Sequence, residues 1–320
     1  MIKHVKTLAA CLSALLLAGC AASPTPAPTT TCYHVAMIAK STSTEFWSAV
    51  FAGAEAAATE YNMDLTITGS ESEEDYSSQN DLIEKAVEDG AQAIIFSASD
   101  YQKNAAAIDA AADKGVRIVV VDSAVNSSKV SAYVGADNYG AGQMAAKSAL
   151  ENVEGPLHVG LVNYNVNSPN AQEREEGVID TLTASGRAEV AATVYSVATP
   201  ENARAETLTM LARHPEINVL ISFNEAVSVG AAQAVSDLDR ADDLWMVAFD
   251  SNITTVDALH TGAVDAMVVQ NTYGMGYFSV ENAYKLLAGQ GSDVTRETET
   301  ATRIIDRSNI FALDGQKAVF

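Results

Sequence analysis

The chain has 320 residues, of which 41 are acidic and 19 are basic, and its formal net charge is −22. This acidity argues strongly against a nucleic-acid binder, because neutralising phosphates needs a surplus of Lys and Arg. Three cysteines cannot build a disulfide framework, and the length predicts two globular lobes stabilised by packing.

Residues 1–19 have the features of an export signal. Lys3 and Lys6 precede an apolar run that is too short for a comfortable membrane span, and this run ends at Leu17-Ala18-Gly19-Cys20. These four residues resemble the lipobox of bacterial lipoproteins, which implies that Cys20 carries lipid. The alternative is a plain signal peptide in which Cys20 is incidental. Residues 20–32 are rich in Pro and Thr and are predicted to be an extended tether.

From Tyr33 onward, short β-branched runs alternate with longer amphipathic segments, which predicts parallel sheets with crossover helices. Cys32, where the tether meets the fold, is expected to be a buried free thiol. Strands are predicted at 35–39, 65–68, 93–96, 117–121, 157–162, 189–195, 219–222, 245–249 and 264–269. Helices are predicted at 46–61, 76–88, 104–114, 140–151, 171–183, 203–213, 226–238 and 273–287.

Two of these helices begin with similar short segments, which form a weak internal repeat. Asp137-Asn138-Tyr139-Gly140-Ala141-Gly142 and Asn271-Thr272-Tyr273-Gly274-Met275-Gly276 each open a helix after a strand. Glycine and tyrosine are both common at turns, so chance explains the pair as readily as a shared structural role does.

The common catalytic motifs are missing from the sequence. There is no Gly-x-Ser-x-Gly, P-loop, His-Glu-x-x-His or Cys-x-x-Cys motif, and the histidines are scattered singly. We therefore expect no enzyme activity, no cofactor and no metal site. The acidic run 71–75 is predicted to be a solvated loop.

Polar residues gather where the predicted strands end, which is where open parallel sheets bind ligands. Carboxylates and amides at these ends, with aromatic rings beside them, suit a polyhydroxylated molecule such as a sugar. Each residue also has a local alternative: the aspartates could cap turns, the aromatic pair could be core, and the amides could bind nearby backbone. One shared site explains so many coincidences better. The residues are Lys40, Phe46, Trp47, Asp122, Ser123, Asn224, Asp250 and Gln270.

Several segments in fixed order resemble the ribose- and galactose-type periplasmic binding proteins, the solute receptors of bacterial ABC importers. They include Thr44-Glu45-Phe46-Trp47, the run 115–122, Arg174-Glu175-Glu176-Gly177, Ser222-Phe223-Asn224-Glu225 and Val247-Ala248-Phe249-Asp250. The resemblance covers nearly all of residues 33–320. It implies an α/β fold of two similar doubly wound parallel-sheet lobes joined by three crossovers, with the ligand between the lobes.

The resemblance also divides the chain. It places the N-terminal lobe at 33–137 plus 271–302 and the C-terminal lobe at 138–270 plus 303–320. In the family pattern, Phe46 and Trp47 match sugar-stacking aromatics, Asp122 and Asp250 match hydroxyl-binding carboxylates, and Asn224 and Gln270 match amides. Arg174 lies in the family's arginine-bearing segment.

Four positions depart from the pattern of ribose binders. Thr44 stands where an asparagine is usual, Ser123 and Gln172 stand where arginines are common, and a second-lobe aromatic falls on Ala198. The two lost arginines remove cationic donors from the pocket. The departures therefore point to a different or modified sugar, or to another polyol-like solute.

The sequence thus predicts a monomeric, extracytoplasmic receptor that is anchored to the membrane through Cys20 and delivers a sugar or polyol to an ABC transporter permease. An alternative is a sensor that presents its solute to a membrane histidine kinase or chemoreceptor. Both roles use the same closed lobe surfaces, so the sequence leaves them open.

Overall fold

The computed structural model describes residues 32–319. The predicted signal, the lipidation site at Cys20 and the tether up to residue 31 lie outside the described residues. Cys32 is free but exposed, so its predicted burial is wrong. The reason is that the first strand begins only at His34, which leaves the thiol beyond the edge of the core. Within the described residues, no helix is both long and apolar enough to cross a membrane.

The first sheet has six strands, and every neighbouring pair in it is parallel. Its order is β11-β5-β4-β3-β1-β2. The strands are β1 (His34–Ala39), β2 (Asp64–Gly69), β3 (Ala93–Phe96), β4 (Arg117–Val121), β5 (Ala132–Gly135) and β11 (Glu297–Glu299).

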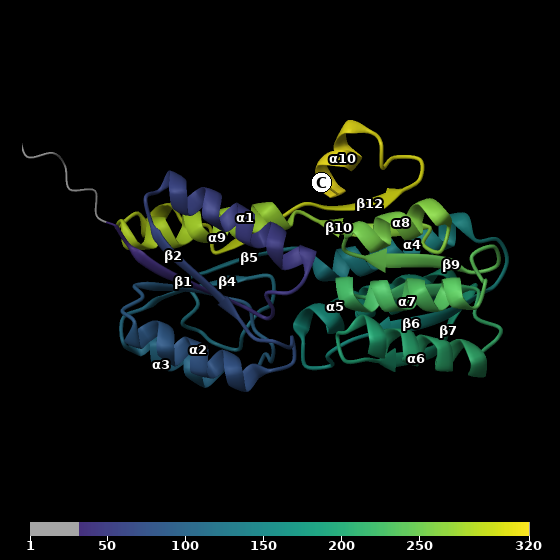
Figure 1. Cartoon of the computed structure of the whole chain (residues 1–320), viewed down its shortest axis with the longest axis horizontal. Helices are drawn as coiled ribbons and strands as arrows, with labels where there is room; N and C mark the ends of the chain where they lie inside the picture. Colours follow the sequence, from purple (N-terminus) through teal and green to yellow (C-terminus); the bar gives the residue numbers. More distant parts are fainter. Residues whose placement is uncertain (1–31, 320) are drawn as a thin grey trace, which may run out of the picture. The chain divides into compact units, whose positions relative to one another are not determined.

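Helices cover both faces of this sheet, which explains why its central strands are continuous apolar runs. Helices α1 (Glu45–Glu60) and α9 (Thr272–Leu287) lie on one face, and α2 (Tyr76–Glu88) and α3 (Ala105–Asp113) lie on the other (Figure 1). Alternate side chains of β1 point to opposite faces of the sheet, so that Met37 packs in the core beneath α1 and α9 and Ile38 packs in the core beneath α2 and α3. We call this sheet with its four helices the first lobe.

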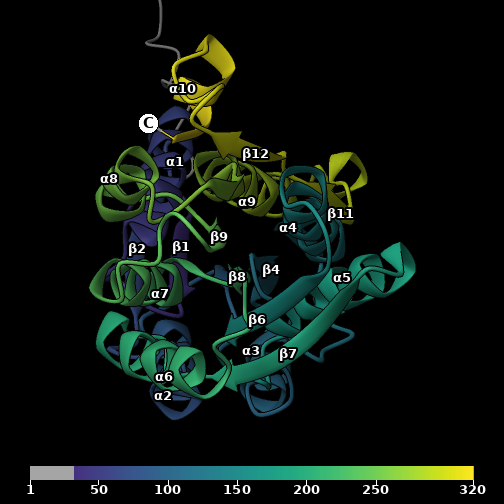
Figure 2. The ribbon, with the colours of Figure 1, turned by 90° about the vertical axis from the view of Figure 1, so that its right-hand side faces the viewer.

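The second sheet follows the same plan, with order β12-β10-β9-β8-β6-β7. Only β12, at its edge, is antiparallel to its neighbour. Helices α4 and α5 lie on one side and α6, α7 and α8 on the other (Figure 2). The strands are β6 (Leu157–Asn163), β7 (Ala188–Tyr195), β8 (Val219–Ser222), β9 (Trp245–Phe249), β10 (Ala266–Gln270) and β12 (Thr302–Asp306). The helices are α4 (Asn138–Asn152), α5 (Pro169–Ser185), α6 (Pro200–Arg213), α7 (Glu225–Asp237) and α8 (Ile253–Thr261).

We call this second sheet with its helices the second lobe. The chain passes between the two sheets three times: from β5 to α4, from β10 to α9, and from β11 to β12. A short 3₁₀ turn (Gly291–Asp293) precedes β11, and the C-terminal helix α10 (Leu313–Val319) follows β12.

The two similar segments, residues 137–142 and 271–276, have the same structural role, because each begins a helix directly after the chain passes from one sheet to the other. The Asp137 carboxylate accepts the backbone N–H of Gly140 at 2.8 Å, and the Asn271 side chain accepts that of Gly274 at 2.9 Å. The next glycine along lets two helices touch. A Cβ on Gly142 would lie 2.1 Å from the carbonyl of Arg174, and one on Gly276 would lie 1.8 Å from that of Val50.

All nine predicted strands and eight predicted helices are present, with ends that differ by up to three residues. Three strands and two α-helices were not predicted, namely β5, β11, β12, α8 and α10, nor was the 3₁₀ turn. The strand β11 is the three residues Glu-Thr-Glu, which carry no apolar signal and form a strand only because β5 offers a free edge. Helix α8 begins with four β-branched residues, which weakens its helical signal, and its start is set instead by a capping box at Asn252.

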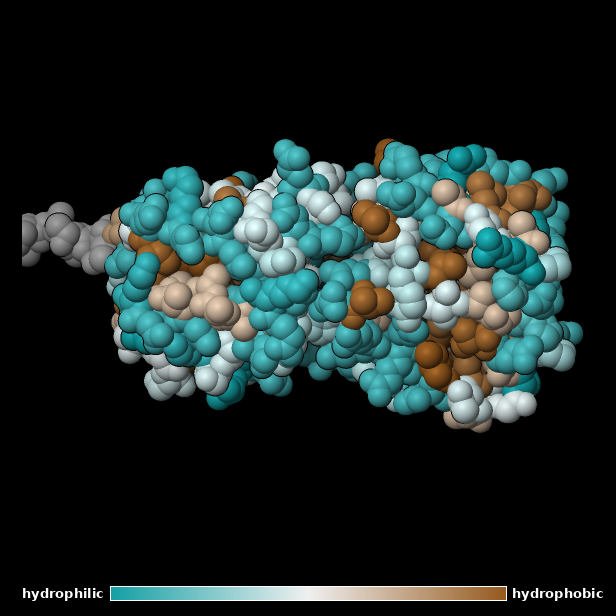
Figure 3. Space-filling view, turned by 90° about the horizontal axis from the view of Figure 1, so that it is seen from below, coloured by the Kyte–Doolittle hydropathy of each residue, from teal (hydrophilic) through white to brown (hydrophobic). Residues whose placement is uncertain are grey.

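The surface agrees with the acidic composition. The face in Figure 3 is mostly hydrophilic, and its hydrophobic side chains gather mainly over the second lobe. Exposed apolar residues of that lobe include Val190 and Tyr195 on the edge strand β7. Single exposed apolar residues of this kind are normal on soluble folds.

Candidate ligand-binding site

Asp122 and Asp250 occupy equivalent positions in the two lobes. Asp122 follows β4 and Asp250 follows β9, each the third strand in its sheet order. The backbone N–H of Asp122 donates to Val134 and that of Asp250 to Val268, both at 2.9 Å. Both side chains are buried, with exposed fractions of 4% and 5%.

Both aspartates also have positive φ, 61° for Asp122 and 64° for Asp250. Non-glycine residues seldom adopt this conformation, although Asp and Asn tolerate it best. The other two non-glycine cases in the described chain, Asn62 and Asp239, lie just past helix ends. At Asp122 and Asp250 the left-handed turn instead ends a buried strand and turns a carboxylate toward the space between the lobes.

The Asp122 carboxylate is held by groups from both lobes. Lys40, which follows β1 and is equally buried, places its Nζ 3.3 Å from Oδ2. Ser97 donates to Oδ2 at 3.1 Å, and Asn170 of the second lobe donates to Oδ1 at 2.7 Å. Burial acts to lower the pKa of Lys40, but Asp122, with Tyr164 and Glu73, raises it above its ordinary value. Lys40 is therefore a buried ammonium that is fixed in place by carboxylates.

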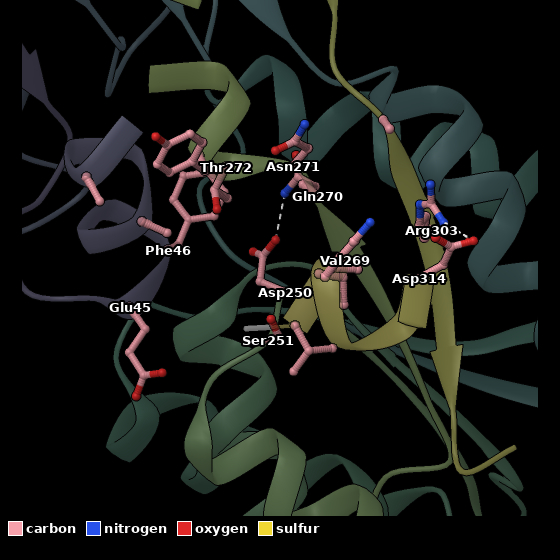
Figure 4. Close-up of a pocket in the computed structure, with 17 residues that line it drawn as sticks. Glu45, Phe46, Asp250, Ser251, Val269, Gln270, Asn271, Thr272, Arg303 and Asp314 are labelled. Atoms are coloured by element: carbon pink, nitrogen blue, oxygen red, sulfur yellow. Dashed lines mark hydrogen bonds and ion pairs between the residues drawn. The ribbon is translucent and has the colours of Figure 1, made fainter. Parts of the chain in front are cut away.

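Asp250 is bound by the last residue of the neighbouring strand. Gln270 donates its amide to Oδ1 of Asp250 at 2.6 Å, as the dashed line in Figure 4 shows. Burial raises the pKa of Asp250 to about 6; Arg174 and Gln270 act to lower it, and Glu225 and Asp122 act to raise it. The oxygen of the Gln270 amide, Oε1, has no hydrogen-bond partner among the described residues.

Arg174, on α5, is buried and positioned by the second lobe. Its Nε donates to Asn138 at 2.9 Å and its Nη1 to the carbonyl of Phe223 at 2.7 Å. The guanidinium lies 4.7 Å above the Phe249 ring. These contacts fix a second cation close to Asp250.

The aromatic pair lies at the start of α1. Thr44 caps the helix by accepting the N–H of Trp47 at 3.4 Å. Trp47 is 1% exposed and belongs to the core of the first lobe, with Phe46 packed edge-on at 5.2 Å between ring centres. The Trp47 indole N–H donates to Glu73 at 3.2 Å.

Two residues at the start of α7 reach across to the first lobe. Asn224 caps α7 through its oxygen, while its amide nitrogen donates to Glu73 at 3.4 Å. Glu225 accepts the backbone N–H groups of Glu45 at 3.2 Å and of Phe46 at 2.7 Å, which are the first two of α1. In return, the Glu45 carboxylate accepts the N–H of Ile253 at the start of α8, at 3.2 Å. Each lobe thus supplies a carboxylate to a helix N-terminus of the other.

These side chains surround one small cavity of about 30 Å³, roughly the volume of a water molecule. The structure brings nine of the eleven predicted ligand-binding residues to it: Lys40, Thr44, Phe46, Trp47, Asp122, Arg174, Asn224, Asp250 and Gln270. Ser123 and Gln172 are not among the lining residues. Ser123 is buried behind Asp122, and Gln172 is exposed and donates to the carbonyl of Val166.

Sequence reasoning missed four lining residues with polar side chains: Glu73, Tyr164, Asn170 and Glu225. The acidic run 71–75 was expected to be solvated, and for Glu73 and Glu74 this is wrong. Both are half-buried, and Glu74 accepts the backbone N–H of Ala198 in the second lobe at 2.9 Å. No local signal marks these two residues within the run 71–75, because their partners in the second lobe, Asn224 and Ala198, lie more than a hundred residues away.

A larger cavity of about 520 Å³ adjoins the first one and shares Phe46, Asp250 and Gln270 with it (Figure 4). Its remaining walls come from α1, Ser251, the end of β10, the β10–α9 crossing, β12 and α10. The ion pair of Arg303 with Asp314, 3.7 Å apart, lies on its far side. The carboxyl ends of the strands therefore open toward a space large enough for a small molecule.

Comparison with known proteins gives consistent results. A carbohydrate transporter solute-binding protein from Agrobacterium radiobacter, solved with D-arabinose, matches with a TM-score of 0.86 at 22% identity, over 91% of this chain and 99% of that one. At this identity the likeness shows the fold. A sugar transporter from Clostridium phytofermentans is 31% identical, with a TM-score of 0.79 over 86% of this chain and 99% of that one.

Two sequence comparisons complete the picture. A D-ribose/D-allose-binding protein from Pseudomonas aeruginosa is 31% identical over 121 residues, so that the match spans only 38% of the length of either protein. The model of the periplasmic binding protein domain family matches residues 35–291, which is most of the chain. The chain therefore belongs to the periplasmic binding protein domain family.

Proposed function

We propose that this protein is an extracytoplasmic solute-binding lipoprotein that captures a sugar or related polyol between its lobes and delivers it to the permease of an ABC importer. The observation that carries the proposal is the convergence of side chains from both lobes on one cavity, which is lined by the equivalent carboxylates Asp122 and Asp250. Oriented carboxylates and amides bind hydroxyls, and Phe46 offers a ring to the C–H face of a sugar.

The proposed role is binding without catalysis. Asp122 is occupied by Lys40, Ser97 and Asn170, and Asp250 is occupied by Gln270. These contacts support hydroxyl recognition rather than nucleophilic attack. Sugars named with relatives of the same fold, D-arabinose and D-fucose, make pentoses and hexoses the first compounds to test.

Isothermal titration calorimetry of the purified protein against pentoses, hexoses and polyols tests the proposal. At a ligand concentration 100 times its dissociation constant, the free energy of unfolding rises by about 2.7 kcal/mol, so thermal shift provides a second readout. We expect Asp250→Asn to bind about tenfold more weakly, because a neutral acceptor replaces a charged one.

The matched control is Asp239→Asn, which changes an exposed aspartate of the same lobe that has the same backbone conformation. It should bind as the parent does. If no sugar or polyol binds, or if Asp250→Asn binds as tightly as the parent, the proposed ligand class is wrong.

The proposed membrane anchor is tested separately. Acyl chains on Cys20 would hold the protein in the membrane fraction, and two or more chains are needed for stable attachment. We expect Cys20→Ser to move the protein to the soluble fraction of the producing bacterium. Equal membrane retention of the parent and the variant would contradict the lipidation.

A further inference from the structure

The charges that line the ligand cavity do not balance. Four carboxylates, those of Glu73, Asp122, Glu225 and Asp250, face only two cations, Lys40 and Arg174. This leaves a formal excess of two negative charges. Glu225 has its partner in the N-terminus of α1, and Asp122 is paired with Lys40. Arg174 is the cation that acts on Asp250.

Glu73 is the carboxylate without a cation of its own. Among the described residues, no Lys or Arg forms an ion pair with it, and its two oxygens accept neutral N–H groups of Trp47 and Asn224. Burial raises its pKa, although Lys40 and Trp47 act in the opposite direction. A half-buried anion in this position is costly unless a positive charge joins it.

An independent feature also calls for a hydrogen-bond donor. Oε1 of Gln270, in a side chain that is only 4% exposed, lacks a partner among the described residues, and the same side chain donates to the Asp250 carboxylate. The two residues lie together on the wall that both cavities share (Figure 4). A buried acceptor without a donor is rare in native structures, so a bound molecule that supplies one fits here.

A metal ion does not fit these groups. Within residues 32–319, no three His, Cys, Asp or Glu side chains are grouped closely enough to hold one. Hydroxyl groups would satisfy the acceptors but leave the negative charge uncompensated. A protonated amine does both, because it donates up to three charge-assisted hydrogen bonds and carries one positive charge. A sugar acid or sugar phosphate would add to the imbalance.

We propose that the site selects an amine-bearing sugar, with the Glu73 carboxylate as the partner of the ligand ammonium. This inference rests on the proposed sugar-binding function and specifies its ligand class. Glu73 lies on the loop between β2 and α2, so it can withdraw from Trp47 and Asn224 as the ligand enters.

Calorimetry with matched sugar pairs tests the inference: D-glucosamine against D-glucose, D-galactosamine against D-galactose, and the N-acetyl form of each amine. We expect at least one amine to bind about tenfold more tightly than both its neutral parent and its N-acetyl form. Glu73→Gln should remove most of this preference, because it should weaken binding of the amine about tenfold more than binding of the neutral sugar. Glu71→Gln, on the same loop but exposed, is the control and should keep the preference.

Three outcomes would overturn the inference. Neutral parent sugars that bind as tightly as their amines would show that the negative charge of the cavity does not favour an amine-bearing ligand. Equal changes in amine and neutral affinity in Glu73→Gln, in either direction, would show that Glu73 only occupies space. Absence of binding by every sugar would reject the proposed function as well, whereas tight binding of neutral sugars alone leaves that function intact.

Discussion

Replacing Glu225 by glutamine should weaken the contact that holds α1 of the first lobe against α7 of the second. The carboxylate is buried and accepts two backbone N–H groups at the start of α1, at 3.2 and 2.7 Å, and the Asn252 amide at 3.1 Å. Glutamine has nearly the same shape but only one acceptor oxygen and no charge. One of the two N–H groups of α1 therefore loses its partner.

The magnitude follows from these contacts. A hydrogen bond to a charged group contributes about 1.5–3 kcal/mol, so losing one and neutralising the other should cost the closed arrangement about 2–3 kcal/mol. This corresponds to about a 30- to 150-fold shift of the equilibrium between closed and open lobes. If only the closed form retains ligand, the apparent dissociation constant of Glu225→Gln exceeds that of the parent by at most this 30- to 150-fold factor, and it reaches the factor when the open form dominates in the parent as well.

Two measurements check the prediction. Small-angle X-ray scattering of the ligand-free protein should give a larger radius of gyration for Glu225→Gln than for the parent, and calorimetry with the best sugar of the panel should give weaker binding. Glu45→Gln neutralises the reciprocal but exposed acceptor of the Ile253 N–H, so its effect should stay below about 1 kcal/mol.

The control is Glu201→Gln, which neutralises an exposed acidic residue in the first turn of α6. This residue has no hydrogen bond to the first lobe among the described residues. It should match the parent in both assays. If Glu225→Gln keeps the parental radius and affinity, the reasoning that this carboxylate holds the lobes together is refuted.

Three further predictions concern stability and the exposed thiol. The pKa of Asp250 is about 6 in the folded protein, above its ordinary value of 3.8, so the folded state holds the Asp250 proton more tightly than the unfolded state does. The contribution of Asp250 to the free energy of unfolding is therefore fully present below about pH 4 and falls by about 3 kcal/mol as the pH rises to about 7. Urea unfolding should show Asp250→Asn gaining about that much relative to the parent between those pH values, and a constant difference would contradict it. Gly276→Ala should lower the free energy of unfolding by about 2 kcal/mol or more, because its Cβ would lie 1.8 Å from the Val50 carbonyl of α1, whereas Gly291→Ala meets no atom within 4 Å and should be neutral. Cys32 should react with a maleimide in the native protein, and mass spectrometry should find one label fewer on Cys32→Ser; protection of the thiol until unfolding would contradict its exposure.

The sequence by itself determined the fold class and most of its elements. Runs such as Ile94–Phe96 and Ile118–Val121 are apolar on both faces, and only a strand covered by helices on both sides accommodates them. Because every parallel strand ends at the same edge of its sheet, reading the residue after each run was enough to find Asp122 and Asp250. The same reading found Lys40, which the structure pairs with Asp122.

The tertiary structure alone decided which polar residues face the space between the lobes. Glu73 contacts Asn224, and Glu225 contacts the start of α1, across 151 and about 180 positions of sequence. Nothing local separates Glu73 from the exposed Glu71, since the two differ in their distant partners and not in their neighbours. The edge strand β11 and the exposure of Cys32 were missed for the same reason. Strand pairing and burial depend on residues from another part of the chain, which the local sequence pattern does not show.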